Sequence, residues 1–376
     1  MLSDETLHHL RDVIDQPDLS ATSYRLIRRL GRGGMATVYL VEDRELRREV
    51  ALKVLSDPDP AGNLAARLLA EARLLARLEH PNLAPVHDVG TLPDGRVFYV
   101  MKYVRGVRLD AWRRGDPTRP TALRLFQKIC DAVAFAHAAG VVHRDLKPEN
   151  IMIGEFGEAL VMDWGVAKRL PALPAVGAAS AATGPAAAAA GANGDAPTLA
   201  LDPTAARANP SPAPSGTGAP ITEAGSLIGT PAWMAPEQAR GEGDRIDART
   251  DVHALGALLY FLLSGRAPFE GSTPAVILKA AAEGLPRPLR QIDRSIPKPL
   301  EAICSRAMAR DPADRYDSAR SLAADVERHL DGLAVLAYPE TLPERAGRLA
   351  RQNRVLLLMV AAYLVMRLVV LFFAGR

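Results

Sequence analysis

The sequence HRDLKPEN, at residues 143–150, places a carboxylate, an ammonium group and an amide at fixed spacing on one loop. Phosphoryl transfer needs this combination. Asp145 can orient an attacking hydroxyl and accept its proton, Lys147 can neutralise charge on the transferred phosphoryl group, and Asn150 can ligate a magnesium ion. The tripeptide His-Arg-Asp alone would equally describe a surface loop with a local ion pair, but all eight residues in this order rarely coincide by chance.

A second acidic residue follows a short apolar run. Residues 160–162, Leu-Val-Met, predict a buried strand, and Asp163-Trp164-Gly165 comes directly after it. The strand would deliver the carboxylate of Asp163 to its end, where Gly165 allows the backbone to turn. We therefore expect Asp163 at the end of a buried strand.

The N-terminal part contains a glycine-rich hairpin. Residues 30–38, Leu-Gly-Arg-Gly-Gly-Met-Ala-Thr-Val, lie between β-like runs at 24–30 and 38–42. Backbone N–H groups at such a tip can approach phosphate oxygens closely. Glycine-rich hairpins are often only structural, however, and Ala36 stands where the pattern G-x-G-x-x-G has its third glycine.

An alternating strand and an amphipathic helix follow the hairpin. Residues 50–54 alternate as a strand and carry Lys53. Residues 63–79 have leucines at helical spacing with charged residues between them, which predicts a helix with Glu71 in its middle. A strand lysine and a helix glutamate are thus close in sequence to the glycine-rich hairpin.

Together these motifs resemble those of eukaryotic-like (Hanks-type) serine/threonine protein kinases of bacteria. The resemblance covers residues 24–331. It implies an α+β, bilobal protein-kinase fold with a β-rich N-terminal lobe, a helical C-terminal lobe, and ATP between them.

The resemblance also implies roles for individual residues. Lys53 would hold the α- and β-phosphates of ATP and pair with Glu71, although a helix glutamate can instead be solvated beside a neighbouring arginine. Asn150 and Asp163 would bind Mg²⁺, with Mn²⁺ as an alternative metal. The catalytic set would be Asp145, Lys147, Lys53 and Glu71. The residues expected to contact the nucleotide are Gly31, Gly33, Gly34, Val38, Ala51, Lys53, Met101 and Tyr103.

Trp164 departs from the family pattern, which has Phe in this position. The substitution leaves the metal ligand in place, but a bulkier ring must fit against the helix that carries Glu71. Residues 98–106 resemble the last strand of the small lobe and the interlobe hinge, where Met101 would limit access to the pocket behind adenine.

Three downstream segments extend the resemblance. Residues 229–237, GTPAWMAPE, resemble the end of an activation segment, and residues 251–256 resemble the family's D-x-W-x-x-G with His253 at the aromatic position. Arg315 would pair with Glu237. These segments would stabilise the large lobe, so they support the fold more than the activity.

The same resemblance indicates the acceptor and the mode of control. Lys147 and Thr230 are typical of the serine/threonine branch, so the acceptor is expected to be a Ser or Thr hydroxyl. Arg144, next to the catalytic aspartate, suggests activation by phosphorylation, because it needs an anionic partner on the activation segment. Thr222 and Ser226 are the nearest candidates.

Composition bounds the remaining possibilities. The chain has 376 residues, 48% hydrophobic and 24% charged, with a net charge of +3 spread along it, so we expect no nucleic-acid partner. Its two cysteines are isolated and lack metal-binding spacing. Residues 1–23 form an N-terminal extension without a secretory signal.

In residues 171–220, Ala, Pro and Gly make up 34 of 50 positions, which predicts a disordered insertion in the activation segment.

The C-terminal end predicts a membrane anchor. Residues 355–373 are apolar except for Arg367, and 19 helical residues span about 28 Å, enough to cross a hydrocarbon core. The preceding basic juxtamembrane linker, residues 332–354, carries an arginine at every third position near its end: Arg345, Arg348, Arg351 and Arg354. This asymmetry places the kinase-like region in the cytoplasm, with a single pass through the inner or plasma membrane. The alternative is a buried helix docked on the large lobe with Arg367 at its rim.

The sequence therefore predicts a membrane-anchored signalling kinase that transfers phosphate from ATP to Ser or Thr hydroxyls of protein substrates. Control by activation-loop autophosphorylation would involve self-association, and the anchor would contact membrane lipids. One rival is a catalytically silent pseudokinase that acts as a membrane scaffold; a kinase of small molecules such as aminoglycosides would lack the GTPAWMAPE segment.

Overall fold

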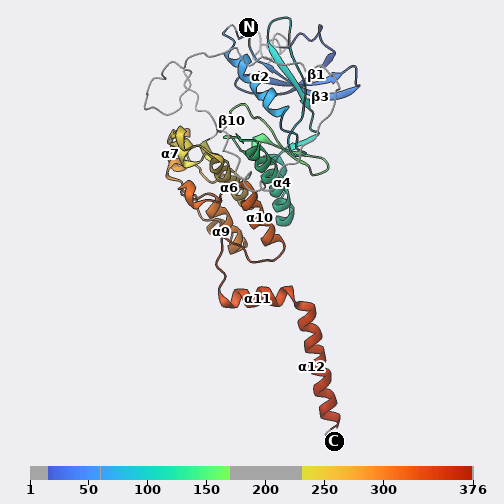
Figure 1. The fold of residues 1–376 in the computed structure, drawn as a ribbon, viewed down its shortest axis with the longest axis vertical. Helices are drawn as coiled ribbons and strands as arrows, with labels where there is room; N and C mark the ends of the chain where they lie inside the picture. Colours follow the sequence, from blue (N-terminus) through green and yellow to red (C-terminus); the bar gives the residue numbers. More distant parts are fainter. Residues whose placement is uncertain (1–15, 60, 170–230, 375–376) are drawn as a thin grey trace, which may run out of the picture.

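The computed structural model describes residues 16–59, 61–169 and 231–374. In this part of the chain, a β-rich N-terminal lobe lies against a helical C-terminal lobe, from which two further helices extend (Figure 1). The predicted α+β, bilobal architecture is thus confirmed. Outside the described residues lie the predicted insertion at 171–220, most of the N-terminal extension, and the activation-segment residues Thr222, Ser226 and Thr230.

The N-terminal lobe is a five-stranded antiparallel sheet with one helix packed on it. The strand order is β1-β2-β3-β5-β4, and helix α2 contacts β3, β4 and β5. The bounds of these elements are β1 Tyr24–Arg32, β2 Ala36–Asp43, β3 Arg48–Leu55, α2 Asn63–Leu75, β4 Val86–Thr91 and β5 Val97–Lys102.

Strand alternation decides which side of the sheet Lys53 occupies. On β3, Val50 and Leu52 pack into the apolar cluster on one face, while Ala51 and Leu55 pack into the cluster that includes α2. Successive side chains of a strand point to opposite faces, so Lys53 shares the α2 side with Ala51 and Leu55.

Helix α2 ends at Leu75, earlier than the predicted end at residue 79. The N–H groups of Arg77 and Leu78 bond to the carbonyls of Leu74 and Leu75, three residues back, at 3.1 and 3.0 Å. These tight turns replace the last helical turn and bury Leu78. The spacing of the leucines could not distinguish a continued helix from these tight turns, because both would bury the side chain of Leu78.

The C-terminal lobe is built around helix α6, Ala248–Ser264, which is buried along most of its length. It packs against α4 (Arg119–Ala138), α9 (Lys298–Ala307) and α10 (Ala319–Leu330). A Cβ on Gly256 would lie 2.7 Å from Met308 and 2.8 Å from Ala307. The helices can therefore approach this closely only because α6 has a glycine here. The smaller helices are α3 Leu109–Arg114, α5 Pro236–Ala239, α7 Pro274–Glu283 and α8 Leu289–Ile292.

Short strands line the face of this lobe toward the sheet. They form a three-stranded sheet of order β6-β8-β9 and a two-stranded pair of β10 with β7. Their bounds are β6 Gly106–Arg108, β7 Val141–Val142, β8 Ile151–Gly154, β9 Ala159–Val161 and β10 Lys168–Arg169. Asp163 follows the end of β9, as predicted, although β9 itself begins and ends one residue before the predicted strand.

A buried ion pair joins helix α5 to the segment between α9 and α10 in the C-terminal lobe. Arg315 donates from Nη1 and Nη2 to the two carboxylate oxygens of Glu237 at 2.8 and 2.7 Å, and both side chains have 0% exposure. Thr250 adds a hydrogen bond to Glu237 at 2.9 Å. The pairing inferred from the sequence is therefore present.

His253 is fully buried, and neither of its ring nitrogens has a hydrogen-bond partner among the described residues. Its ring stacks on Phe269 with an interplanar angle of 9°. Burial, assisted by the nearby Arg315, lowers the pKa of His253 to about 3. His253 thus fills the aromatic position of the motif as a neutral ring.

Replacing His253 with Phe is expected to reduce the loss of stability in mild acid. The unfolded chain binds a proton on this histidine below about pH 6.5, whereas the folded protein does not do so until about pH 3. Stability is therefore lost as pH falls between these values, by about 2 kcal/mol at pH 5. Urea unfolding at pH 7 and pH 5 measures the difference, and an equal pH dependence in both proteins would contradict it.

Two helices follow the C-terminal lobe, α11 at Leu342–Gln352 and α12 at Arg354–Ala374. Within the described residues, no single helix is long and apolar enough to cross a membrane. The segments Leu342–Gln352 and Leu357–Leu368 are long and apolar enough to span a membrane only when taken together, and they are bent by 81° relative to each other.

Candidate active site

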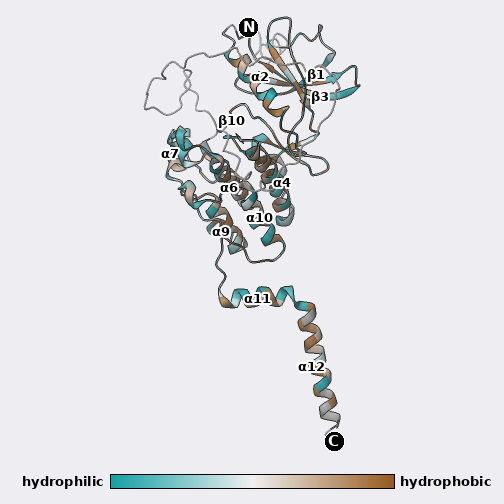
Figure 2. Ribbon diagram, viewed as in Figure 1, coloured by the Kyte–Doolittle hydropathy of each residue, from teal (hydrophilic) through white to brown (hydrophobic). Residues whose placement is uncertain are grey.

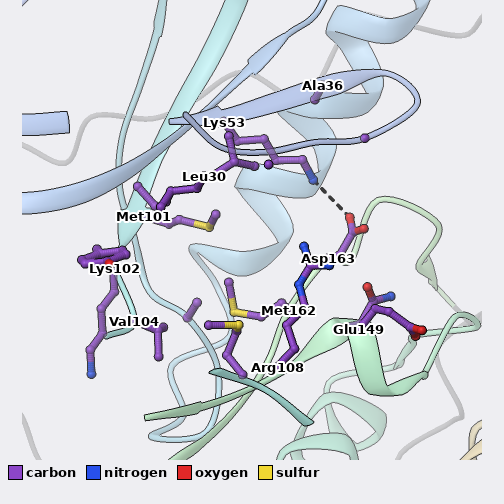
Figure 3. A pocket seen from close by; sticks show the side chains of 18 of the residues that line it. Leu30, Ala36, Lys53, Met101, Lys102, Val104, Arg108, Glu149, Met162 and Asp163 are labelled. Carbon is purple, nitrogen blue, oxygen red and sulfur yellow. Dashed lines mark hydrogen bonds and ion pairs between the residues drawn. The ribbon is translucent and has the colours of Figure 1, made fainter. Parts of the chain in front are cut away.

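A cleft of about 450 Å³ separates the two lobes (Figure 3). Its N-terminal wall comes from β1, β2 and β3, and its opposite wall from the loops around β8 and β9. Of the residues predicted to bind nucleotide or metal, those lining the cleft are Gly31, Gly33, Val38, Ala51, Lys53, Met101, Tyr103, Asn150 and Asp163. Gly34 is not among the lining residues, and Ala36 is.

Lys53 connects the two walls of this cleft. Its Nζ lies 2.8 Å from Glu71 Oε1 and 3.1 Å from Asp163 Oδ1, and Figure 3 marks the contact with Asp163. Burial alone would lower the pKa of Lys53, but the carboxylates of Glu71 and Asp163 raise it above its usual range. Lys53 therefore stays cationic, and Glu71 is its partner rather than a solvated surface glutamate.

Tyr99 completes this cluster from β5. Its hydroxyl donates to Glu71 Oε1 at 2.9 Å, and its ring is buried. Burial raises the pKa of Tyr99, so the hydroxyl remains a donor. Lys53 Nζ also lies 3.0 Å from the other oxygen, Oε2, so both Glu71 oxygens are held, which fixes the direction in which the carboxylate meets Lys53.

Two predicted residues, Lys147 and Asn150, contact Asp145, and of these three only Asn150 lines the cleft. Lys147 Nζ lies 2.7 Å from Asp145 Oδ2, and Asn150 Nδ2 donates to the same oxygen at 3.2 Å and to the backbone carbonyl of Asp145 at 2.8 Å. Asn150 uses its amide nitrogen here, so its amide oxygen is left for a metal.

Asp163 stands between these clusters in a left-handed backbone conformation, with φ of 59°. Burial alone would raise its pKa, but the ammonium of Lys53 lowers it, so the carboxylate is ionised. Its side chain is 51% exposed. An ionised carboxylate and an amide oxygen at one cleft suit Mg²⁺, which usually takes one or two protein ligands and completes its shell with phosphates and water. Within the described residues, no cluster of three or more His, Cys, Asp or Glu side chains could hold a metal.

The backbone of the catalytic loop is fixed from beneath by Asp251. This buried carboxylate accepts from the N–H groups of His143 and Arg144 at 2.7 and 2.8 Å and lies 2.8 Å from His137 Nε2. Burial alone would raise the pKa of Asp251, but the hydrogen bond from His137 lowers it. Arg144 has φ of 73°, a conformation that costs energy for a non-glycine residue, so these bonds hold the loop in a strained shape.

Trp164 fits the C-terminal lobe without displacing Glu71. Its ring is 1% exposed, lies 4.5 Å from the ring of His143 and donates weakly to the carbonyl of Val161 at 3.4 Å. Gly165 allows the close approach to the helix, because a Cβ there would lie 3.2 Å from Glu71 Oε2. The bulkier ring is thus compatible with a formed Lys53–Glu71 pair.

Sequence reasoning missed Tyr99, His137 and the role of Asp251 as the support of the catalytic loop. A buried acid within an apolar run is a signal that partners must exist. Nothing in the sequence shows that these partners are His137 and two backbone N–H groups more than 100 residues away.

Comparisons with known proteins match most of this chain. The family model described as "Protein kinase domain" matches residues 24–182 and 215–326, and the unmatched residues 183–214 fall inside the predicted insertion. The chain is 33% identical to the serine/threonine-protein kinase PknB of Mycolicibacterium smegmatis over 344 residues, which cover 89% of this chain and 47% of that protein.

Two further bacterial relatives show similar values. Serine/threonine-protein kinase PrkC of Bacillus subtilis is 31% identical over 312 residues, covering 82% of this chain and 40% of the relative. Serine/threonine-protein kinase Pkn1 of Myxococcus xanthus is 34% identical over 301 residues, covering 79% and 36%. The chain spans less than half the length of these relatives.

Proposed function

This chain belongs to the protein kinase family, among the Hanks-type serine/threonine kinases of bacteria, and we propose that it phosphorylates Ser or Thr hydroxyls of proteins with ATP. One observation carries the proposal: Lys53, Asn150 and Asp163 line one cleft. Glu71 is paired with Lys53, and Asp145, which is paired with Lys147, is hydrogen-bonded to Asn150. A decayed kinase usually lacks at least one of these groups, so this set favours activity over the pseudokinase alternative.

Asp145 performs the proton chemistry in this proposal. Its carboxylate accepts a hydrogen bond from the Ser or Thr hydroxyl, orients the oxygen toward the transferred phosphorus, and takes the proton as the new P–O bond forms. Lys147, 2.7 Å away, balances the carboxylate and offers a positive charge to the phosphoryl oxygens. Asn150 keeps the Asp145 backbone and side chain in position through its two hydrogen bonds.

The other residues hold the nucleotide. When bound, ATP supplies the phosphoryl group and Mg²⁺ neutralises charge on its phosphates. Lys53 would contact the α- and β-phosphates, and Asn150 and Asp163 would ligate the metal. Met101 and Tyr103, which line the cleft, would contact the adenine. Glu71 positions Lys53 and does not itself meet the substrate.

A direct test uses the full-length protein with Mg²⁺–ATP and a generic protein acceptor, followed by mass-spectrometric mapping of phosphosites. Phosphate on Ser and Thr is expected. Nucleotide binding without any transferred phosphate, either to the acceptor or to the kinase itself, would favour the pseudokinase alternative.

We expect the activation segment to control this activity by autophosphorylation between two copies of the chain. The guanidinium of Arg144 is half-buried and has no ion pair within the described residues, and burial lowers its pKa. An anionic phosphate would offset this cost of burial.

Phosphatase treatment is expected to lower the activity, and incubation with ATP to restore it after a lag. The double variant Thr222→Ala, Ser226→Ala should lose both the lag and the recovery. Time courses of substrate phosphorylation measure both effects, with Ser272→Ala, an exposed serine of the C-terminal lobe, as the control. Unchanged kinetics in the double variant would exclude these two sites.

We also propose that α12 anchors the kinase in a membrane with its catalytic lobes in the cytoplasm. The described side chains of α12 are exposed along the helix, which includes Leu364 and Met366, and Arg367 is the only charged residue of segment 355–373. Figure 2 shows α12 as mostly hydrophobic and apart from the C-terminal lobe, as an anchor would be and a docked helix would not.

Fractionation tests the anchor. The full-length protein is expected to stay in the membrane fraction through carbonate and high-salt washing. The reason is the sequence of residues 355–373, which holds one charged residue in 19 and which only detergent would then extract from lipid. Recovery of the full-length protein in the soluble fraction would contradict the anchor.

A further inference from the structure

Helix α11 is held against the C-terminal lobe by its polar side. Glu344 lies 2.8 Å from Lys298 Nζ and accepts from the Tyr338 hydroxyl at 3.0 Å, while Arg348, one turn later, lies 2.8 Å from Glu340. Glu344 and Arg348 are the half-buried residues of α11. Of the four juxtamembrane arginines, Arg348 is therefore paired with a carboxylate of the protein itself.

The segment leading into α11 is fixed as well. Buried Asp325 accepts from the Tyr316 hydroxyl at 2.7 Å and from the backbone N–H groups of Leu336 and Ala337 at 2.6 and 3.0 Å. Val335 is buried in the core of the C-terminal lobe. The chain leading into α11 is thus fixed to the lobe as far as Ala337. Helix α11 itself is tied to the lobe by Glu344 to Lys298 and by Gln352 to the carbonyl of Gly332.

The opposite side of α11 is apolar and uncovered. Leu342 is 83% exposed, Leu349 is 44% exposed, and Ala346 and Ala350 between and beside them are exposed. At 100° per residue these four share one face, roughly opposite Glu344 and Arg348. A helix on a soluble domain normally turns its apolar stripe toward the core, and α11 does the reverse.

The apolar face of α11 points away from the kinase lobes, toward the side on which α12 extends. The axes of the two helices differ by 81°. Figure 1 shows the kinase lobes and α12 on opposite sides of α11. If α12 crosses a bilayer, α11 lies nearly parallel to the membrane plane with its apolar face toward the lipid. The exposed Arg345, on the flank of that face, and Arg354, at the junction, would reach the headgroups.

We propose that α11 is an interfacial helix that binds the surface of an anionic bilayer and, because its polar side is fixed to the C-terminal lobe, holds the catalytic cleft in one orientation above the membrane. This inference rests on the proposed anchoring by α12. The occupant of the apolar face is lipid, since the face is continuous with an apolar helix and flanked by cations.

Fluorescent labels on single cysteines test the proposal in the full-length chain, because Cys130 and Cys304 are buried and should not react in the folded protein. Ala346→Cys reports on α11, Leu364→Cys on α12, and Phe156→Cys, whose native side chain is 94% exposed, serves as the control on the kinase lobes. The protein is reconstituted into phosphatidylcholine vesicles with or without phosphatidylglycerol, and quenching by lipids with shallow or deep nitroxides is measured.

The label at 346 is expected to be quenched by shallow nitroxides, more strongly with phosphatidylglycerol, and the label at 364 by deep ones, while the label at 156 is unaffected. Adding Leu342→Glu and Leu349→Glu should bring quenching at 346 down to the level of the control and leave quenching at 364 unchanged. Arg345→Gln and Arg354→Gln should each weaken the binding of α11 to the surface of anionic vesicles. The ratio of α11 bound to the bilayer surface to α11 detached from it should fall about five-fold in each variant.

Two results would overturn the inference, and they are distinguishable from failure of the anchor. Deep quenching at 364 with no quenching at 346 would leave the anchor standing and exclude the interfacial helix. Energy transfer between labels at 346 that grows with protein density, again without lipid quenching, would assign the face to a second copy of the chain. Absence of quenching at 364 would instead refute the anchor.

Discussion

Replacing Asp145 with Asn is expected to lower the rate of phosphoryl transfer by at least about 10²-fold, the usual effect of losing general-base assistance. The amide has nearly the same shape, so the hydrogen bonds from the N–H groups of His143 and Arg144 to Asp251 are retained. It cannot take the hydroxyl proton, however, and it leaves Lys147 without its carboxylate partner. Initial rates at saturating Mg²⁺–ATP measure the effect.

Asp163→Asn is the matched control, because it is the same substitution at a second aspartate of the candidate active site. It should weaken Mg²⁺–ATP binding as well as the rate, whereas Asp145→Asn should leave nucleotide binding nearly intact. Calorimetric titration of both variants separates the two roles. A wild-type rate in Asp145→Asn would show that this carboxylate does not act as the base.

Replacing Arg315 with Met is expected to destabilise the protein by about 3–5 kcal/mol, a large share of the stability of a typical domain. The substitution leaves the Glu237 carboxylate charged and unpaired where it has no access to solvent. The pairing with Arg315 lowers the pKa of Glu237, against the effect of burial, so the paired carboxylate is fully ionised at neutral pH. Chemical unfolding of the full-length protein measures the loss.

The exposed pair of Arg105 with Glu49, at 2.9 Å, provides the control. Arg105→Met should cost less than about 1 kcal/mol, because water solvates the remaining charge. Combining Arg315→Met with Glu237→Leu should recover part of the loss, since no isolated charge is then buried. Equal effects of Arg315→Met and Arg105→Met would refute this account of the buried pair.

The elements around the cleft were predictable because their determinants are local. The alternation of residues 50–54 fixes the face of Lys53, and the helical spacing of residues 63–79 places Glu71 on a helix. The order of the loop residues 143–150 predicted the catalytic loop through a family resemblance. Only the sheet register brings Lys53 opposite Tyr99, a pairing that the sequence does not show.

Other features depend on long-range packing and could not be predicted. The support of residues 143–144 by Asp251 joins segments more than 100 residues apart. The fit of Trp164 depends on the space beside His143. From the sequence, the four arginines at every third position were all expected to face the membrane headgroups. In the structure, Arg348 instead pairs with Glu340. The contact of Glu344 with Lys298 turns the polar side of α11 toward the C-terminal lobe and its apolar side outward.

Transfer of labelled phosphate tests the central claim most directly. Full-length protein is incubated with Mg²⁺ and ATP labelled in its terminal phosphate, and the label bound to Ser and Thr of the acceptor and of the kinase is counted beside Asp163→Asn. The proposed function predicts label on Ser and Thr well above that background. Wild-type protein that binds ATP yet transfers no more label than Asp163→Asn would contradict it.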